Sequence, residues 1–493
     1  MGQTFDVLIV GGGVLGACLY HHLCQAGLAV VVADQRDFGS GTTQASGMLV
    51  WGGLLYLRQG DLPTVYRLCR SRDKLVHSLN GQVRTVDCRL YLADGQEHER
   101  HLLSLALQAY WLCALFRYRR PRWDWNASEN DLLKIGALAP RHLHYQEAAL
   151  TDSDARFALS WIMSHEDDCH VPLNHCSVEG GSFSGETGLW RIGLHDRILE
   201  RRGDVRARLV INAAGVWVDE VNERFGIKSF YRHVISKGVF LGLRRDPRHQ
   251  SAMFFRVQDS TDVLSLLPWG PVSLWGPTET VVDSPSSGFD VHPEEILWLV
   301  NQANSRLAST ISPTDIVSIR CGARALAVPN TDRAMNGSLA LSRRVVVDRR
   351  KAPPWISLYG GKLTDCMTLA RNLASELSIK LRDVTSRSTS ASTKGHDPTM
   401  YSHPAFSVPI VDAQWCAEHE HCWTLDDYLR RRTNVAQWVP RCGLGTSGEF
   451  APLIAGFARH FAGESRDSAD AAARDYTALV DSRFDRLIAA CLA

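Results

Sequence analysis

Three glycines near the start of the chain have the spacing of a phosphate-binding turn. Gly11, Gly13 and Gly16 form the pattern G-x-G-x-x-G within VLIVGGGVLGACL, residues 7–19. The first glycine permits a tight turn, the second lets the backbone approach a pyrophosphate, and the third lets a helix pack closely on a strand. The N–H groups and positive dipole end at the start of that helix attract phosphates. This chemistry is that of dinucleotide binding.

The segments around these glycines predict the strand–helix–strand unit that the pattern requires. Residues 5–10 are apolar and rich in β-branched side chains, which is typical of a strand, and residues 17–26 predict a helix that ends at Gly27. Residues 28–33 predict a second buried strand, and Asp34 at its end can accept hydrogen bonds from ribose hydroxyls. The alternative is a glycine-rich turn without a ligand.

Composition limits the class of protein. The length of 493 residues predicts two or three domains. Lys and Arg number 54 against 53 Asp and Glu, a balance that does not favour nucleic acid as a partner. The 13 cysteines contain no CxxC pair and indicate reduced thiols in a cytoplasmic protein. We expect neither a signal peptide, since a strand pattern begins at Phe5, nor a membrane span, since no apolar run reaches 18 residues.

Three later stretches favour FAD over NAD. LVINAAGVWVD at 209–219 predicts a strand that ends in small residues, and LYGGKLTD at 358–365 predicts a strand that runs into a glycine pair and a helix. GTTQASGMLVWGGLLYL at 41–57 follows the first unit with hydroxyl residues and glycines. A nucleotide domain that begins near residue 5 and is completed near residue 377 contains a large insertion. That arrangement suits FAD, whose long body runs from the first unit to a distant flavin.

Taken together, these stretches resemble the flavin-dependent glycerol-3-phosphate dehydrogenases, within the wider D-amino-acid-oxidase-like superfamily. The resemblance covers most of residues 1–440 and rests on GGGVLGA, GGLLYLRQGD, INAAGVWVD, SKGVFL, LLPWGP, WGPTE, CGARAL, LYGGKLTD and TLDDYLRRRT. It implies noncovalent FAD and hydride transfer from a small anionic alcohol-type substrate to the flavin. The residues expected to hold FAD are Gly11, Gly12, Gly13, Leu15, Gly16, Asp34, Gln35, Thr42, Thr43, Ser46, Gly47, Val178, Ala213, Gly215, Gly360, Gly361, Lys362, Leu363 and Thr364.

The predicted fold class is α/β: a Rossmann-like FAD-binding domain, an inserted β-rich substrate domain and a C-terminal helical domain. The expected boundaries are 1–80, 150–224 and 315–380 for the FAD-binding domain, 81–149 for a mostly helical insertion, 225–314 for the β-rich substrate domain, 381–403 for a linker, and 404–493 for a helical cap.

The resemblance also implies which side chains meet the substrate. Arg324 in CGARAL matches a substrate-binding arginine, and Arg343 in LSRRVVV matches a second one. Lys362 matches a lysine beside the flavin, and Tyr56 matches the tyrosine of the family's GGLRYL. Arginine suits a phosphate or carboxylate because its planar fork makes paired charge-assisted bonds. The alternatives are a salt-bridged Arg324, a solvated Lys362 and an exposed Arg343.

Four positions near the expected pocket depart from the family pattern. Leu55 stands where the family has arginine, and Phe240 stands where it has histidine. Met48 and Trp51 stand where it usually has lysine and histidine. A buried phosphate that lacks one arginine loses charged hydrogen bonds worth about 1.5–3 kcal/mol each. We therefore expect a substrate that is larger or more apolar than glycerol 3-phosphate, with one anionic end held by Arg324.

The missing histidine leaves the mechanism open. Oxidation of an alcohol must remove the O–H proton as the hydride leaves, and the candidate acceptors are Lys362, Tyr56, water or another group. An amine can release its hydride without a side-chain base, so an amine or amino-acid oxidase is one alternative. A true glycerol-3-phosphate dehydrogenase with a remodelled pocket is another, and a flavin-binding protein without catalysis is a third. The electron acceptor (quinone, oxygen or a protein) and the oligomeric state stay open.

Two further clusters contain residue types that can bind a metal ion or anionic lipid. Cys169, His170, His175 and Cys176 lie in HEDDCHVPLNHC, but their spacing matches no common zinc signature, and we expect no metal. LFRYRRPRW at 115–123 mixes arginines with aromatic residues. It predicts either a solvated loop or a peripheral contact with anionic lipid.

Overall fold

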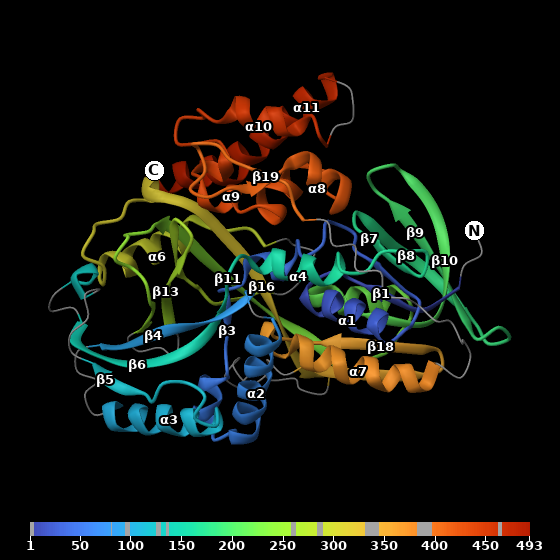
Figure 1. Cartoon of the computed structure of the whole chain (residues 1–493), viewed down its shortest axis with the longest axis horizontal. Helices are drawn as coiled ribbons and strands as arrows, with labels where there is room; N and C mark the ends of the chain where they lie inside the picture. The colour runs from blue at the N-terminus through green and yellow to red at the C-terminus, as the bar shows by residue number, and fades with distance from the viewer. Residues whose placement is uncertain are drawn as a thin grey trace.

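Figure 1 shows the chain folded around two sheets that lie side by side, with a cap of helices above them. The computed structural model describes residues 4–79, 81–93, 99–124, 130–134, 138–257, 263–282, 289–330, 345–381, 397–461 and 466–493. Within these residues, no helix has both the length and the apolar character needed to cross a membrane.

The first sheet has the predicted strand–helix–strand unit at its centre. Its strands run in the order β17-β18-β10-β1-β2-β7, and β1 is parallel to both β10 and β2. The strand bounds are β17 Val346–Lys351, β18 Pro354–Tyr359, β10 Arg201–Asn212, β1 Thr4–Val10, β2 Val30–Ala33 and β7 His170–Leu173. Helix α1, Val14–Gln25, begins three residues before the expected start and connects β1 to β2.

Both faces of the first sheet are covered, which explains the apolar run in its central strand. Helices α1, α4 (Asp154–Ile162) and α7 (Cys366–Leu381) pack in one core with Val7 and Ile9. An antiparallel ribbon of β8 (Cys176–Ser184) and β9 (Leu189–Asp196) packs in another core on the opposite face. Every residue from position 5 to position 10 is therefore buried, as expected for a strand in a parallel sheet.

The second sheet is mostly antiparallel. Its strands run in the order β15-β11-β14-β13-β12-β4-β6-β3, while β16 pairs with β11 and β5 pairs with β6. The bounds are β3 Leu49–Val50, β4 Val83–Ala93, β5 Arg122–Asp124, β6 Leu138–Leu150, β11 Tyr231–Arg244, β12 Ala252–Arg256, β13 Val263–Trp269, β14 Val272–Gly276, β15 Thr280–Val282 and β16 Ile316–Pro329. The helices of this part are α2 Leu62–Ser78, α3 Glu99–Cys113 and α6 Pro293–Asn304, and α5 Val218–Arg224 follows β10.

Two segments differ from the sequence-based expectation. Residues 81–149 were expected to be mostly helical, but β4, β5 and β6 lie there with the helix α3. Val86, Cys88 and Leu90 are buried in β4 at every second position, which is the period of a strand. Strand β16 lies in a segment assigned to the FAD-binding domain, yet it pairs with β11 in the second sheet along most of its length.

The C-terminal part is a helical cap, as predicted. Its helices are α8 Ala413–His419, α9 Val435–Trp438, α10 Ala451–Ala458, α11 Arg466–Val480 and α12 Arg486–Leu492, and β19 Met400–Tyr401 pairs with β20 Ile410–Val411. The cap lies over the junction of the two sheets (Figure 1). The two sheets and the cap confirm the predicted fold class, and the domain boundaries stay predictions. The expected linker falls mainly on residues outside those described.

Candidate functional site

The glycine turn lies at the carboxyl end of β1 and leaves no room for side chains. Gly11 has a φ of +102°, and a Cβ added to it would lie 2.7 Å from the Ala213 carbonyl oxygen. A Cβ added to Gly16 would lie 1.9 Å from the Gly11 carbonyl oxygen, so α1 could not pack on the turn. Gly13 directly precedes the first residue of α1. The start of this helix is thus bare backbone, which fits a pyrophosphate.

Asp34 organises this turn from the end of β2. Its carboxylate accepts hydrogen bonds from the Gly12 N–H at 2.8 Å and the Arg36 N–H at 3.0 Å. Burial raises the pKa of Asp34, and these two backbone bonds partly offset the rise. Thr43 Oγ1 accepts from the Val14 N–H at 3.0 Å, which ties the 3₁₀ turn at Thr42–Ala45 to the start of α1.

The end of the neighbouring strand β10 completes the candidate dinucleotide site. We call this site the cradle; it consists of the turn at Gly11–Gly16, Asp34 and the residues Ala213–Gly215. The Ala213 N–H donates to the Val10 carbonyl at 2.9 Å, which holds the two strand ends together. Gly215 follows with a φ of +59°, and no atom lies within 4 Å of its Cβ position. Open space beside Gly215 and bare backbone at Gly11–Gly16 fit the adenosine and pyrophosphate parts of FAD. Val178 contributes its carbonyl, which accepts from Arg224 Nη1 at 2.6 Å, and Gln35 is half-buried beside Asp34.

A second glycine turn, Gly360–Gly361, follows β18 and continues into a 3₁₀ turn at Leu363–Asp365. The Gly360 N–H donates to His233 Nε2 at 2.9 Å. Burial lowers the pKa of His233 to about 4, so its ring is neutral and can accept this bond at neutral pH. Thr364 Oγ1 donates to the Trp51 carbonyl at 2.9 Å. Sequence analysis missed His233, because its partner lies 127 residues away.

Two of the predicted catalytic residues lie together at this turn. Lys362 Nζ is 4.1 Å from the centroid of the Tyr56 ring, a cation–π contact. Tyr56 is buried, whereas Lys362 is half-buried. Leu15, predicted to bind FAD, packs on the turn, since a Cβ on Gly361 would lie 2.6 Å from Leu15 Cδ1.

The segment Ser46–Met48 is held by a buried ion pair that sequence analysis did not identify. Arg320 is fully buried and donates to the Asp154 carboxylate at 2.6 Å and to the Ser46 carbonyl at 3.2 Å. The same carboxylate accepts from the Ser46 N–H at 2.9 Å. Met48 has a φ of +60°, a left-handed conformation that side chains rarely adopt. The loop is therefore positioned by contacts from α4 and β16.

Phe240 forms an apolar wall against this segment. A Cβ added to Gly47 would lie 3.1 Å from Phe240 Cζ, and Phe240 is buried. Met48 is also buried, and Trp51 packs on Phe254 with ring centroids 5.1 Å apart. Leu55 lies at the exposed edge, directly before the buried Tyr56.

Arg324 projects from β16, where it is paired in register with Ser236 of β11. Its Nη1 donates to Ser236 Oγ at 3.3 Å and lies 3.8 Å from a carboxylate oxygen of Glu279. Its side chain is about a quarter exposed, with a relative accessibility of 26%. The guanidinium therefore has a partner and also faces solvent. Arg343 lies outside the described residues.

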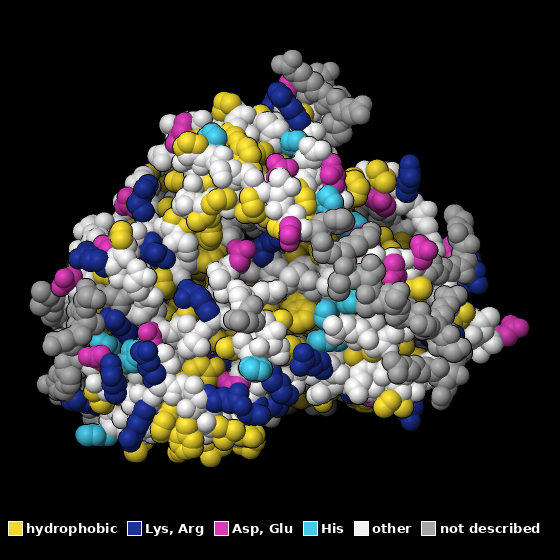
Figure 2. Space-filling model, viewed as in Figure 1, with side chains coloured by type: hydrophobic (Ala, Val, Ile, Leu, Met, Phe, Trp, Pro, Cys, Tyr) yellow, Lys and Arg dark blue, Asp and Glu magenta, His cyan; other side chains and the backbone are white. Residues whose placement is uncertain are grey.

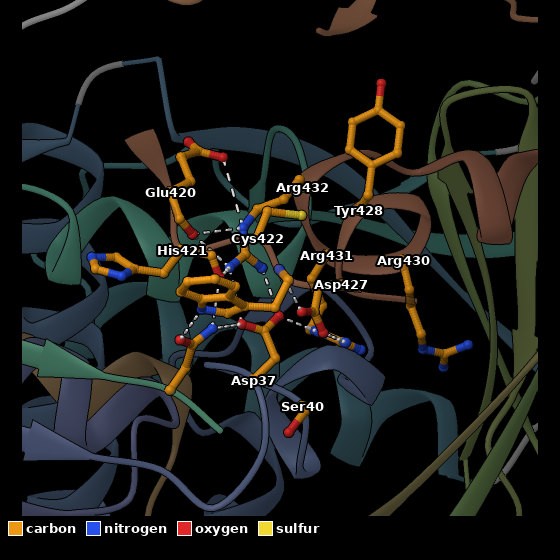
Figure 3. A network of polar contacts seen from close by, with 12 residues as sticks. Asp37, Ser40, Glu420, His421, Cys422, Asp427, Tyr428, Arg430, Arg431 and Arg432 are labelled. Atoms are coloured by element: carbon orange, nitrogen blue, oxygen red, sulfur yellow. Dashed lines mark hydrogen bonds and ion pairs between the residues drawn. The ribbon is translucent and has the colours of Figure 1, made fainter. Parts of the chain in front are cut away.

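Figure 3 shows the polar contacts between residues of the cap and Asp37. Arg431 Nε and Arg432 Nη1 donate to the Asp37 carboxylate at 2.5 and 2.6 Å. Burial raises the pKa of Asp37, but the charges of Arg432 and Arg431 more than offset this and hold the pKa below its usual range. All three side chains are fully buried. The cap is thus joined by an ion-pair network to the loop that follows β2.

The same network accounts for the motif TLDDYLRRRT. Thr424 Oγ1 accepts from the Asp427 N–H at 3.1 Å, which satisfies a backbone donor at the start of this helical segment. Asp427 also pairs with His175 at 2.9 Å and with Arg431 at 2.7 Å. In the part of the chain that the structure describes, Asp37, His175 and Asp427 form the single group with metal-ligand geometry. Arginines already neutralise its carboxylates, and of the four Cys and His residues weighed as zinc ligands only His175 belongs to it.

A glycine-lined dinucleotide cradle, joined to a second sheet that faces a second glycine turn, defines a flavin-dependent oxidoreductase. The chain belongs to the DAO family of FAD-dependent oxidoreductases, whose model matches residues 6–361. This membership confirms the expected family, the enzyme class and FAD as the cofactor.

The chain is also similar to individual flavin-dependent enzymes in sequence and in fold. The chain is 25% identical over 388 residues to an aerobic glycerol-3-phosphate dehydrogenase of Staphylococcus haemolyticus, covering 77% of this chain and 68% of the relative. It is similar in fold to a glycerol-3-phosphate dehydrogenase of Bacillus halodurans complexed with FAD, with a TM-score of 0.70, 17% identity and coverage of 98% and 95%. A glycerophosphate oxidase of Mycoplasma pneumoniae with FAD bound has a TM-score of 0.58, 15% identity and coverage of 78% and 96%.

Proposed function

We propose that this enzyme oxidises an anionic alcohol that resembles glycerol 3-phosphate but is larger or more apolar. The observation that carries this proposal is the contact between Phe240 and Gly47, which gives the segment after the cradle an apolar wall. Met48 is buried at the next position along the segment. An apolar surface favours a substrate with an apolar part, because burying such a part releases about 25 cal/mol for each Å².

Cationic side chains are proposed to hold and orient the charged end. Arg324 would bind the anionic group with its planar fork, since about a quarter of its side chain is exposed beside Ser236 and Glu279. Lys362 and Tyr56 would line the turn beside the flavin, held in place by their mutual contact. FAD, when bound, supplies the hydride acceptor. The hydroxyl proton would pass to Lys362, Tyr56 or water, because Phe240 has no atom that accepts a proton.

Anaerobic mixing of the FAD-loaded protein with candidate substrates tests this function. We expect an anionic alcohol with an apolar substituent to bleach the flavin absorbance. Bleaching by amines or amino acids alone would instead assign C–N oxidation, which the absence of a histidine at position 240 also favours. A flavin that stays oxidised with every candidate would show a binding protein without catalysis.

We also propose that the protein is cytoplasmic and rests on an anionic membrane surface through α3. Leu102, Leu105 and Leu112 are 70%, 67% and 53% exposed and are spaced along one side of this helix. Arg117 and Arg119 follow and are exposed. Figure 2 shows a hydrophobic patch at the lower edge of the molecule, with Lys and Arg side chains above it. Apolar side chains beside cations are typical of interfacial binding.

Vesicle sedimentation tests this contact. We expect binding to vesicles that contain phosphatidylglycerol and loss of binding when Leu102 and Leu105 are both replaced by Gln. Such a contact would favour a lipid-soluble quinone as the electron acceptor. Oxygen uptake without quinone reduction, or unchanged vesicle binding of the double variant, would contradict the proposal.

A further inference from the structure

A small cavity opens on the second sheet, next to the loop that leads from the cradle. It has a volume of about 60 Å³ and lies where the start of β4, the end of β6 and the turn between β13 and β14 meet. A cavity needs a volume of roughly 10–15 Å³ to hold one water molecule, so this cavity has room for a group of several heavy atoms. Gly47, Met48 and Leu49 form part of its lining.

Two arginines face this cavity, and none of the described residues that line it is acidic. Arg84 projects from β4, and Arg245 directly follows the last residue of β11. Thr151 adds a hydroxyl group to the lining. Among the described residues, neither guanidinium has a hydrogen bond or an ion pair with a protein group. The cavity therefore holds two positive charges that no carboxylate of the described chain neutralises.

The two arginines are close enough to repel each other. Burial lowers the pKa of Arg84, and the charge of Arg245 lowers it further. Their backbones are fixed, since Arg84 pairs with Ala149 in the sheet and the Arg245 N–H donates to the Pro271 carbonyl at 2.9 Å. Arg84 is exposed and Arg245 is half-buried, so water screens part of this repulsion, and a bound anion that enters from solvent would offset the rest.

We propose that this cavity binds an oxyanion, the phosphate or carboxylate group of a small molecule, between Arg84 and Arg245. Arginine forks make paired charge-assisted bonds with such groups, and the Thr151 hydroxyl can donate another. The site differs from the one proposed around Arg324, and it does not depend on the proposed reaction. An anion bound here would contact Gly47 and Met48, and so the same segment that Phe240 packs against.

Calorimetric titration of the FAD-loaded protein with inorganic phosphate tests the site. The background is Arg324→Gln, which removes phosphate binding at the proposed substrate site. In this background we expect one saturable site per chain. Adding Arg84→Gln or Arg245→Gln should weaken its affinity at least tenfold. The matched control is Arg244→Gln, an exposed neighbour in the chain that does not line the cavity, and its affinity should not change.

Two outcomes would overturn the site: no saturable binding in the Arg324→Gln background, or equal affinity of the Arg84, Arg245 and Arg244 variants. Flavin content and melting temperature show that each variant is folded. A second arm uses phosphatidylcholine vesicles with and without phosphatidylglycerol. Vesicle binding that depends on Arg84 and Arg245 would assign the phosphate to a lipid headgroup, and its absence would assign it to a free small molecule.

Discussion

The dinucleotide cradle and the wall around Phe240 differ in the kind of atoms that form them. The cradle consists of backbone, because a Cβ at Gly11 or Gly16 would collide with a carbonyl oxygen. The wall consists of side chains, and Phe240 and Met48 present apolar groups where the resembled family has cationic or polar ones. Backbone cradles tolerate almost no change, whereas side-chain walls can change without disturbing the fold. We therefore propose that the first region sets the cofactor and the second region sets the substrate.

The largest effect is expected from filling the cradle. In Gly16→Val, the new Cβ would lie 1.9 Å from the Gly11 carbonyl oxygen, so the helix start and the turn cannot keep their packing. We expect no stoichiometric FAD after purification and reconstitution, measured by the visible absorbance of the flavin. Gly456→Ala is the control, because no atom lies within 4 Å of its Cβ position in α10. A yellow Gly16→Val protein would refute the backbone cradle.

The next largest effect is expected from the ion-pair network of Asp37, Arg431 and Arg432, which we call the clamp because it joins the cap to the loop after β2. Asp37→Ala leaves Arg431 and Arg432 buried without their shared carboxylate. Removing one partner of a buried ion pair costs about 3–5 kcal/mol. We expect the free energy of unfolding in urea to fall by this amount. Asp204→Ala, which breaks an exposed pair with Arg191, should lower the free energy of unfolding far less, because water screens exposed ion pairs. Equal losses in the two variants would contradict the clamp.

Arg324→Gln should act on the substrate and not on the cofactor. Loss of charged hydrogen bonds worth about 1.5–3 kcal/mol predicts a fall in kcat/KM of about tenfold to a hundredfold for an anionic substrate. Flavin content should stay at the wild-type level. Arg349→Gln serves as the control, since this arginine is exposed and pairs with Glu376. A loss of FAD in the Arg324 variant, or an unchanged kcat/KM, would contradict the proposal that Arg324 binds the substrate and does not hold the cofactor.

Restoring a polar group to the wall should broaden the substrate range. Phe240→His places an imidazole where the resembled family has one, next to Gly47. One added charge-assisted interaction of about 1.4 kcal/mol predicts a tenfold faster flavin reduction by glycerol 3-phosphate. Phe240→Leu keeps the wall apolar and should leave that rate unchanged. If both variants reduce at the wild-type rate, position 240 does not contact the substrate.

The smallest expected effect is a dependence of folding stability on pH that arises from two histidines in α1. Burial lowers the pKa of His21 to about 3 and of His22 to about 4 in α1. Both rings stay neutral in the folded protein but become protonated in the unfolded chain below its pKa of about 6.5. Their contribution to stability is therefore complete above pH 6.5 and is lost as the pH falls toward 4. Between pH 7 and 6 we expect a loss of about 1 kcal/mol, and His22→Gln should reduce the slope.

The cradle could be predicted from sequence more completely than the wall. Glycine spacing and strand patterns predict the turn at Gly11–Gly16 and the place of Asp34 at a strand end, because both depend on local geometry. The contacts of His233 with Gly360 and of Arg320 with Asp154 join residues 127 and 166 positions apart, and no local pattern signals them. Strand β4 escaped prediction because the apolar run in α3 dominates its segment. The positions of Arg324, Lys362 and Tyr56 follow the resemblance, and their roles stay proposals.

The central claim is that the cradle binds FAD as in the family, whereas the apolar wall around Phe240 changes which substrate is preferred. Rapid mixing without oxygen tests this claim most directly. The FAD-loaded protein is mixed with glycerol 3-phosphate and, separately, with anionic alcohols that carry apolar substituents, and the rate of flavin bleaching is recorded. We expect at least one substituted alcohol to bleach the flavin tenfold or more faster than glycerol 3-phosphate. If glycerol 3-phosphate proves the fastest of the series, the apolar wall does not select the substrate.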